Sequence, residues 1–247
     1  MSINISELTY KEFSELVPHK VDTAILPIGT MEAHGCTNLG TDITIPEFIA
    51  REIAEKINAL IAPTINYGIT RSLLPYPGSM TVSQDSFIRY VGDVMESLFR
   101  AGFKKLVIIN GHGGHIDELK KLAIEVWRKT GGKTVIIHWW ELVEPMTREF
   151  FGEAGGHAGL DETAMVLAAN PELVKPELCK DVIPYQFRAG TYVYPAAGPI
   201  ILYKPGEGMP MFDLEKAKEY ARKVVDLIAD FIVVVFKGWE KNLAEKS

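Results

Sequence analysis

The sequence has few of the features that direct a chain to nucleic acid, a membrane or an oxidising compartment. Its formal net charge is −6, so no basic surface for a phosphate backbone is expected. The longest apolar run near the C-terminus, residues 228–236, is interrupted by Asp230. It is also far shorter than the roughly 20 residues needed to cross a bilayer. The only two cysteines, Cys36 and Cys179, are too few for a disulfide framework and fit a reducing compartment.

The N-terminal segment also lacks an uninterrupted signal-peptide core, because charged residues are interspersed through it. We therefore expect a cytoplasmic protein without nucleic-acid or membrane partners. The 247 residues are 47% hydrophobic and 23% charged, as in an ordinary globular protein. This length can bury a full core, and no shift in composition marks a boundary. We predict one domain spanning residues 1–247.

Short apolar runs alternate with longer segments in which apolar residues recur every three or four positions. The short runs predict buried strands at 23–28, 60–65, 106–110 and 134–139. The longer segments predict helices at 45–58 (opening at Pro46), 83–102, 116–130, about 160–169 and about 213–236. This alternation predicts an α/β fold, a doubly wound and mostly parallel sheet with helices on both faces.

Two ligand-rich turns directly follow predicted strands. Glu32, His34 and Asp42 come after the first strand, and His112 follows the strand at 106–110. Sites in parallel sheets form outside the carboxyl ends of the strands, so we expect these side chains to meet. Carboxylates and imidazoles are the ligands of hydrolytic metal centres, and a carboxylate can bridge two ions.

A third polar element, residues 155–163, leads into the predicted helix at 160. Its paired glycines let the backbone approach another group closely, and Glu162 lies in the first helical turn, facing back toward the loop. His157 and Asp161 flank that turn. The two acidic residues can instead serve only the helix dipole, and His157 can be a structural loop residue.

These residues resemble the creatininase (creatinine amidohydrolase) family. The resemblance covers about residues 20–175 and rests on four motifs: Leu-Pro-Ile-Gly-Thr-Met-Glu32-Ala-His34-Gly, Gly40-Thr-Asp42, Asn110-Gly-His112-Gly-Gly114 and His157-Ala-Gly-x-x-Glu162-Thr. It implies a doubly wound α/β fold, a small-molecule substrate, homo-oligomers that are often hexamers, and two divalent ions per chain. One ion would take Glu32 and His112 and the other His34 and Glu162, with Asp42 bridging.

The chain departs from the family pattern at three places. The turn between His34 and Asp42 is one residue shorter than usual. His115 stands where many relatives have asparagine, and it remains open whether it is a metal ligand or supports one. Gly114 stands where true creatininases have a carboxylate, which counts against creatinine as the substrate. The same departure makes Glu162 the natural replacement ligand.

The resemblance implies an amidohydrolase that cleaves a non-peptide C–N bond in an amide, formamide or lactam. Two ions in this ligand set would activate a water as the nucleophile. His157 is the expected general acid for the leaving nitrogen, and Asp161 would orient His157 or position the water. A mixed carboxylate–imidazole site suits Zn²⁺ best, with Mn²⁺ or Fe²⁺ as alternatives.

Five further residues are candidates for substrate binding. Trp139 and Trp140 are expected to close a strand and either to line the pocket or to lie in the core or an interface. Arg71, Arg188 and Lys204 lie in irregular segments and would either bind an anionic substrate or form ordinary surface charge. The irregular segment 181–212 predicts a functional loop or an oligomer contact.

Two other functions remain open. One is deformylation of a formylamino-pyrimidine ribotide in flavin and deazaflavin biosynthesis, whose phosphate would need a cationic partner. The other is a non-catalytic, metal-binding scaffold.

Overall fold

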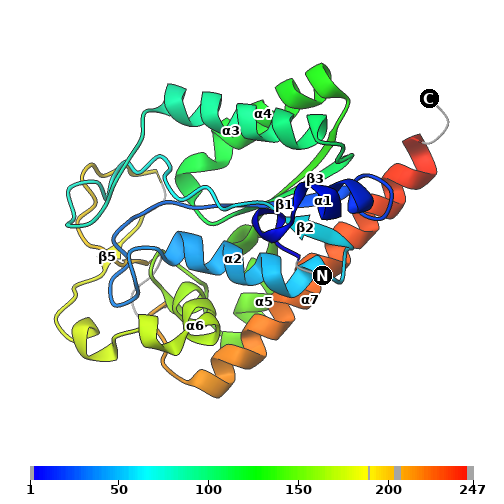
Figure 1. Cartoon of the computed structure of the whole chain (residues 1–247). Helices are drawn as coiled ribbons and strands as arrows, with labels where there is room; N and C mark the ends of the chain where they lie inside the picture. Colours follow the sequence, from blue (N-terminus) through cyan, green and yellow to red (C-terminus); the bar gives the residue numbers. More distant parts are fainter. Residues whose placement is uncertain (1–2, 189, 203–206, 244–247) are drawn as a thin grey trace.

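A four-stranded parallel sheet forms the centre of the computed structural model, which describes residues 3–188, 190–202 and 207–243 (Figure 1). The strands, in the spatial order β2-β1-β3-β4, are β2 (Ala59–Ile61), β1 (Thr23–Ile28), β3 (Lys105–Asn110) and β4 (Lys133–His138). The chain passes from β1 to β2 on one side and then crosses back to β3 on the other. The winding therefore reverses between β1 and β3, which confirms the doubly wound fold.

Helices cover both faces of this sheet, as predicted. The first face carries α1 (Tyr10–Leu16), α3 (Gln84–Arg100) and α4 (Ile116–Thr130). The second face carries α2 (Thr41–Ala54), α5 (Trp139–Phe151), α6 (Leu160–Ala169) and α7 (Leu214–Leu243). Figure 1 shows α3 and α4 above the sheet and α2, α6 and α7 below it.

The strands are apolar along their whole length because both faces are buried. On β1, Leu26 and Ile28 pack with α3 and α4, whereas Ile25 packs with the second helical layer. On β3, Ile108 faces the first layer and Ile109 the second. Successive side chains of a strand point to opposite faces, so one continuous apolar run serves two cores.

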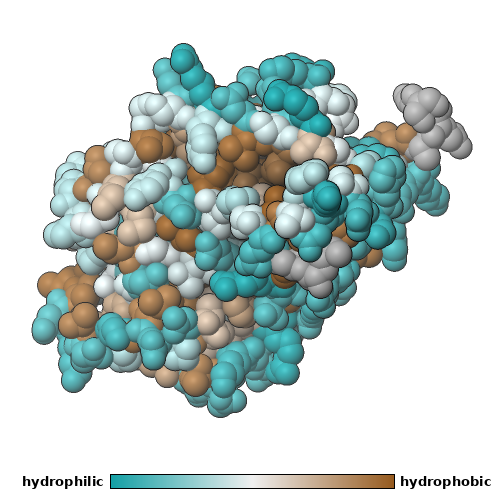
Figure 2. Space-filling view, in the orientation of Figure 1, coloured by the Kyte–Doolittle hydropathy of each residue, from teal (hydrophilic) through white to brown (hydrophobic). Residues whose placement is uncertain are grey.

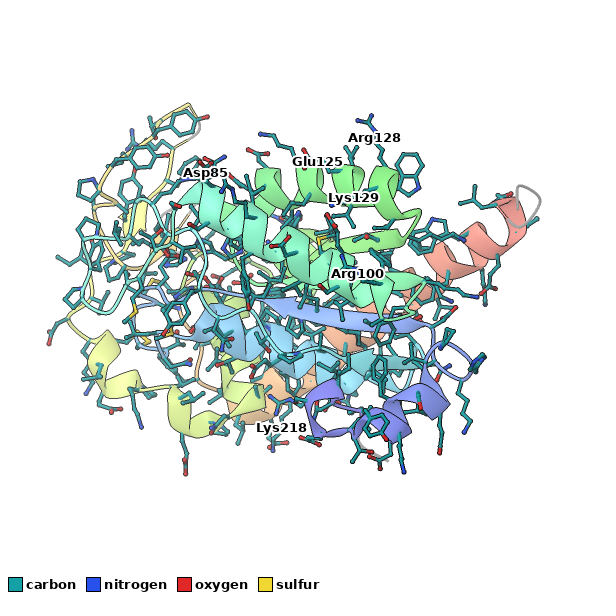
Figure 3. The ribbon with its side chains drawn as sticks, turned by 45° about the horizontal axis from the view of Figure 1, so that its top comes forward. Asp85, Arg100, Glu125, Arg128, Lys129 and Lys218 are labelled. Carbon is teal, nitrogen blue, oxygen red and sulfur yellow. A yellow bond between two sulfur atoms is a disulfide. The ribbon has the colours of Figure 1, made fainter. Side chains whose placement is uncertain are left out.

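The outer helices have the ends that the sequence predicts. Ser83 accepts the Ser86 backbone N–H at 3.2 Å at the start of α3. Gly131 ends α4 with a left-handed φ of 72°. Charged side chains cover the solvent side, where Figure 3 shows the labelled Glu125 and Arg128 pointing away from the sheet. Figure 2 shows hydrophilic side chains over most of one face, with hydrophobic patches at its left end, near the yellow segment of Figure 1.

Two predicted helices begin or end at other residues, and two helices were not predicted. The helix expected at 45–58 starts at Thr41 instead, and this places Asp42 in its first turn. Pro46 was expected to open that helix, but it lies inside, where it cannot donate to the carbonyl of Asp42. The last helix continues to Leu243. Neither α1 nor α5 was predicted.

The strand predictions at 60–65 and 134–139 also need correction. The first is shorter, because Pro63 cannot donate a ladder hydrogen bond, and beyond β2 only Ile65 forms an isolated bridge with Ile28. The second ends at His138. Trp139 and Trp140 therefore open α5 rather than closing a strand.

Cys36 and Cys179 form a disulfide, with their Cα atoms 5.1 Å apart. The cysteine count alone suggested a reducing compartment, and it could not reveal a pair separated by 143 residues in sequence. The irregular segment that follows contains a short parallel pair, β5 (Tyr185–Gln186) and β6 (Ile201–Leu202). Among the described helices, none combines the length and apolar character needed to span a bilayer.

Candidate metal centre

All five predicted metal ligands meet at the carboxyl ends of β1 and β3, where the winding of the sheet reverses. Glu32 and His34 lie in the loop after β1, and Asp42 in the first turn of α2. His112 follows β3, and Glu162 lies in the first turn of α6. Two groups of ligand atoms share Asp42, one with Glu32 and His112 and the other with His34 and Glu162. A third group joins Glu32 and His34 to His157.

The carboxylate of Asp42 faces both imidazoles. Its Oδ1 lies 3.0 Å from His34 Nε2, and its Oδ2 lies 2.9 Å from His112 Nδ1. The side chain is 2% exposed, so water cannot neutralise these groups. One oxygen directed at each histidine is the arrangement that a bridging carboxylate needs.

In His34 and His112, the ring nitrogen that does not face Asp42 is hydrogen-bonded to a backbone carbonyl. His34 Nδ1–H donates to the carbonyl of Glu32, and His112 Nε2–H donates to the carbonyl of Ile69, both at 2.9 Å. A carbonyl can only accept, so each ring presents its other nitrogen to the carboxylates. Such carbonyl contacts commonly fix the tautomer of metal-binding histidines. His34 Nε2 has no hydrogen-bond partner within the described part of the chain, so these donors fit a divalent ion.

The position of Asp42 depends on two glycines at the strand ends. A Cβ atom on Gly29 or Gly111 would lie 2.2 Å or 2.1 Å from the carbonyl oxygen of Asp42. The first turn of α2 can therefore dock between β1 and β3 only if both residues are glycine. Thr37 closes the short turn before α2, since its hydroxyl donates to the carbonyl of His34 and contacts Thr41 Oγ1, both at 2.8 Å.

Glu162 reaches the centre from the opposite side, as its position in the first turn of α6 predicts. Its Oε2 accepts the backbone N–H of Ala158 at 2.6 Å and lies 3.6 Å from His34 Nε2. A side chain at Gly114 is excluded, because its Cβ would lie 2.4 Å from the carbonyl oxygen of Ile69 and 2.6 Å from His112 Nε2. The backbone therefore has no room for a carboxylate at position 114.

The charges of the centre depend strongly on one another. Burial favours neutral imidazoles, yet Asp42 and Glu162 raise the pKa of His34 to about 10. Glu32 and Asp42 likewise raise the pKa of His112 to about 9 against burial. Burial raises the pKa of Glu162 to about 8. Metal ligands must be deprotonated to bind an ion, so the raised pKa values couple metal binding to the release of protons.

The two predicted catalytic residues lie beside the ligands. The His157 ring is 4.2 Å from the His34 ring, its Nε2–H donates to the carbonyl of Ala33 at 2.9 Å, and its Nδ1 lies 3.9 Å from Glu32 Oε2. Burial and His34 lower the pKa of His157 to about 3. Asp161 Oδ1 accepts the backbone N–H of Gly156 at 3.1 Å.

A cavity of about 560 Å³ opens over Glu32, Asp42 and His112. Trp140 and Arg71 line it, as expected for substrate-binding residues. Trp139 is fully buried in the core instead, because it opens α5 on the inner side of that helix.

The other two cationic candidates are Arg188 and Lys204. Arg188 is exposed and is not among the residues that line the cavity. Lys204 lies outside the described residues.

The lining residues that were not singled out from the sequence include Glu144, Thr147, Arg148 and Tyr194. Three of them are on α5, whose pattern is obscured by Pro145 in its middle. The four-residue spacing of Val143 and Thr147, which share the buried face of α5, is the sequence pattern that could have predicted this helix.

The sequence profile of the creatininase family, described as creatinine amidohydrolase, matches residues 6–232. The creatinine amidohydrolase of Pseudomonas putida is 30% identical over 207 residues, which cover 75% of this chain and 79% of that protein. The 3-dehydro-scyllo-inosose hydrolase of Thermotoga maritima is 27% identical, over 91% of this chain and 81% of its own length.

The fold is also similar to that of solved creatininases. A mutant creatininase of the Zn-Zn type superposes with a TM-score of 0.77 at 26% sequence identity. The match covers 94% of this chain and 97% of that structure, so the likeness extends over the sheet and both helical layers.

Proposed function

The chain belongs to the creatininase family of hydrolases, and from this premise we propose that it hydrolyses a non-peptide C–N bond in an amide, formamide or lactam. The observation that carries the proposal is the placement of Asp42, with one oxygen at His34 and the other at His112. The P. putida relative, named as a creatinine amidohydrolase, supports an amide as the substrate class. Gly114 argues against creatinine itself, since no carboxylate fits there.

We propose that Glu32 and His112 hold one divalent ion, that His34 and Glu162 hold the other, and that Asp42 bridges them. Zn²⁺ is the expected metal, as in the Zn-Zn creatininase, with Mn²⁺ or Fe²⁺ as alternatives. When bound, such ions would polarise the amide carbonyl and lower the pKa of a water to roughly 7.

The chain's own residues would bind the substrate and supply the proton. Trp140 lines the same cavity as Glu32 and His112, and its indole offers an apolar surface on which a small planar amide can pack. Departure of the amine requires a proton on its nitrogen. Of the two predicted catalytic residues, His157 is neutral, and its one N–H is engaged with Ala33. Burial raises the pKa of Asp161 to about 6, so we assign the proton to this carboxyl group.

The proposal is tested by removing and restoring the metal. We expect about two divalent ions per chain in the purified protein, measured by elemental analysis. Chelation should abolish hydrolysis of the active compound in a panel of amides, formamides and lactams, and Zn²⁺ or Mn²⁺ should restore it. Two bound ions without turnover of any compound would instead favour the metal-binding scaffold.

Deformylation of a ribotide is a second candidate function, because Arg71 could bind the phosphate of the substrate. Arg71 lines the cavity, and its Nη2 lies 3.0 Å from the buried Glu118 Oε1. The carboxylate fixes the guanidinium, while about half of the arginine side chain stays exposed, so it can meet a phosphate.

We expect Arg71→Gln to raise KM roughly 10- to 100-fold on a phosphate-bearing formamide, since a charged hydrogen bond contributes about 1.5–3 kcal/mol. KM on a neutral formamide should not change. Arg188→Gln is the matched control, because Arg188 is exposed and is not among the residues that line the cavity. Equal KM values for the Arg71 variant and wild type on the phosphorylated compound would exclude this candidate.

A further inference from the structure

His115 is a fully buried histidine outside the proposed ligand set. It ends a short 3-10 helix, Gly113–His115, just after His112. Its Nδ1 lies 3.1 Å from Asn110 Oδ1, and its Nε2 lies 3.1 Å from the backbone nitrogen of Ile69. Both ring nitrogens are therefore occupied by protein groups, and neither is available to a metal ion.

The backbone of Ile69 determines the tautomers of both histidines. Its N–H can only donate, so His115 Nε2 must be unprotonated and the single proton must lie on Nδ1. Its carbonyl can only accept, so the proton of His112 must lie on Nε2. One residue thus imposes opposite tautomers on the two rings and leaves His112 Nδ1 free to face Asp42 and Glu32.

Asn110 closes the ring of hydrogen bonds. Its Oδ1 accepts from His115 Nδ1–H and from the backbone N–H of His112, at 3.1 Å and 3.2 Å. Its Nδ2 donates to the carbonyl of His112 at 2.7 Å and to His138 Nδ1 at 2.9 Å. The orientation of the amide is unambiguous, because the N–H and the carbonyl of one residue bind its two ends.

The surroundings leave room for an imidazole at this position. A Cβ on Gly68 would lie 1.9 Å from His115 Nε2, so any larger residue there would displace the ring. On another side the Phe87 ring stacks on His115, with centroids 4.4 Å apart and planes 22° apart. The ring is thus held in place by packing as well as by its hydrogen bonds.

We infer that His115 is a positioning residue that orients His112 for the metal through the closed cycle His112–Ile69–His115–Asn110. This inference rests on the proposed role of His112 as a ligand. His115 does not touch the substrate or the ion. It keeps Ile69 and Asn110 in place. Ile69 in turn accepts a hydrogen bond from the His112 ring, and Asn110 donates one to the His112 backbone carbonyl.

The first test needs no substitution. Long-range ¹H–¹⁵N correlation spectra of the Zn²⁺-loaded protein should show a proton on Nδ1 of His115 and on Nε2 of His112. The same tautomer on both rings, or a proton on His115 Nε2, would overturn the inference.

The second test compares His115→Phe with His115→Gln. Phenylalanine keeps the stacking but removes both hydrogen bonds, so the ion held by His112 should bind roughly 10- to 100-fold more weakly, as when a partner of a metal ligand is lost. The other ion should bind as in wild type. Glutamine can still accept from Ile69 through its amide oxygen and should restore part of the affinity. Metal affinity is measured by competition with a chelator, and thermal unfolding confirms that each variant is folded.

His138→Phe is the matched control. His138 also bonds to Asn110, but it lies outside the cycle, so both ions should bind unchanged. Equal affinities in wild type and a folded His115→Phe variant would refute the positioning role. Failure of the proposed function would look different: wild type itself would hold fewer than two ions, while the proton on His115 Nδ1 would still be observed.

Discussion

Asp42→Ala is expected to lose both divalent ions together, whereas Glu32→Ala is expected to lose mainly one. Asp42 belongs both to the ligand group of His112 and Glu32 and to that of His34 and Glu162, and its two oxygens face different histidines. Its removal also leaves both imidazoles without their nearest anion. Removing a residue that only hydrogen-bonds to a metal ligand typically lowers metal affinity roughly 10- to 100-fold. The loss of metal affinity in Asp42→Ala should be larger. Hydrolysis should then fall to background.

Elemental analysis of the purified variants measures this directly, with ions counted per chain. Asp42→Asn is the isosteric control, because it keeps the size and shape of the side chain but carries no charge. Near-ultraviolet circular dichroism shows whether each variant is folded. Two ions retained by Asp42→Ala, or equal occupancy in the Asp42 and Glu32 variants, would refute the bridging role.

Asp161→Asn is expected to lower kcat roughly 10²- to 10⁴-fold, the usual contribution of a general acid. Asparagine keeps the hydrogen bond from Gly156 but has no acidic proton. Because burial raises the pKa of Asp161 to about 6, the protonated form is lost as the pH rises through that value. In wild type kcat/KM should therefore have a limb that falls above about pH 6, and this limb should be absent from Asp161→Asn.

His157→Gln separates the two candidate proton donors. The glutamine amide can still donate to the carbonyl of Ala33, so the loop before α6 should be preserved. We expect this variant to keep the falling limb, because His157 is neutral over the measured pH range. If the limb disappears in His157→Gln and persists in Asp161→Asn, the proton comes from the histidine.

Local patterns sufficed for most of the fold. The apolar runs at 23–28 and 106–110 became β1 and β3 with nearly the same bounds, because strands buried on both faces are apolar throughout. The pattern was weaker where proline intervened. Pro145 obscured α5, and Pro46 suggested a later start for α2 than the structure has.

By itself, the sequence determined the fold class, the family and which side chains gather at the strand ends. The residues after parallel strands meet because the sheet brings those ends to one edge. Only the tertiary structure decided how the side chains are directed. The backbone carbonyls of Glu32 and Ile69 turn His34 and His112 toward Asp42, and no spacing in the sequence encodes these contacts.

Contacts between segments distant along the chain were likewise not predictable. The Cys36–Cys179 disulfide and the burial of Trp139 depend on how loops and helices pack, and the spacing of apolar residues in the sequence does not indicate that packing. His115 is the clearest case. Its residue type left open whether it is a metal ligand or supports one. The contacts of its two ring nitrogens with Ile69 and Asn110 favour the supporting role.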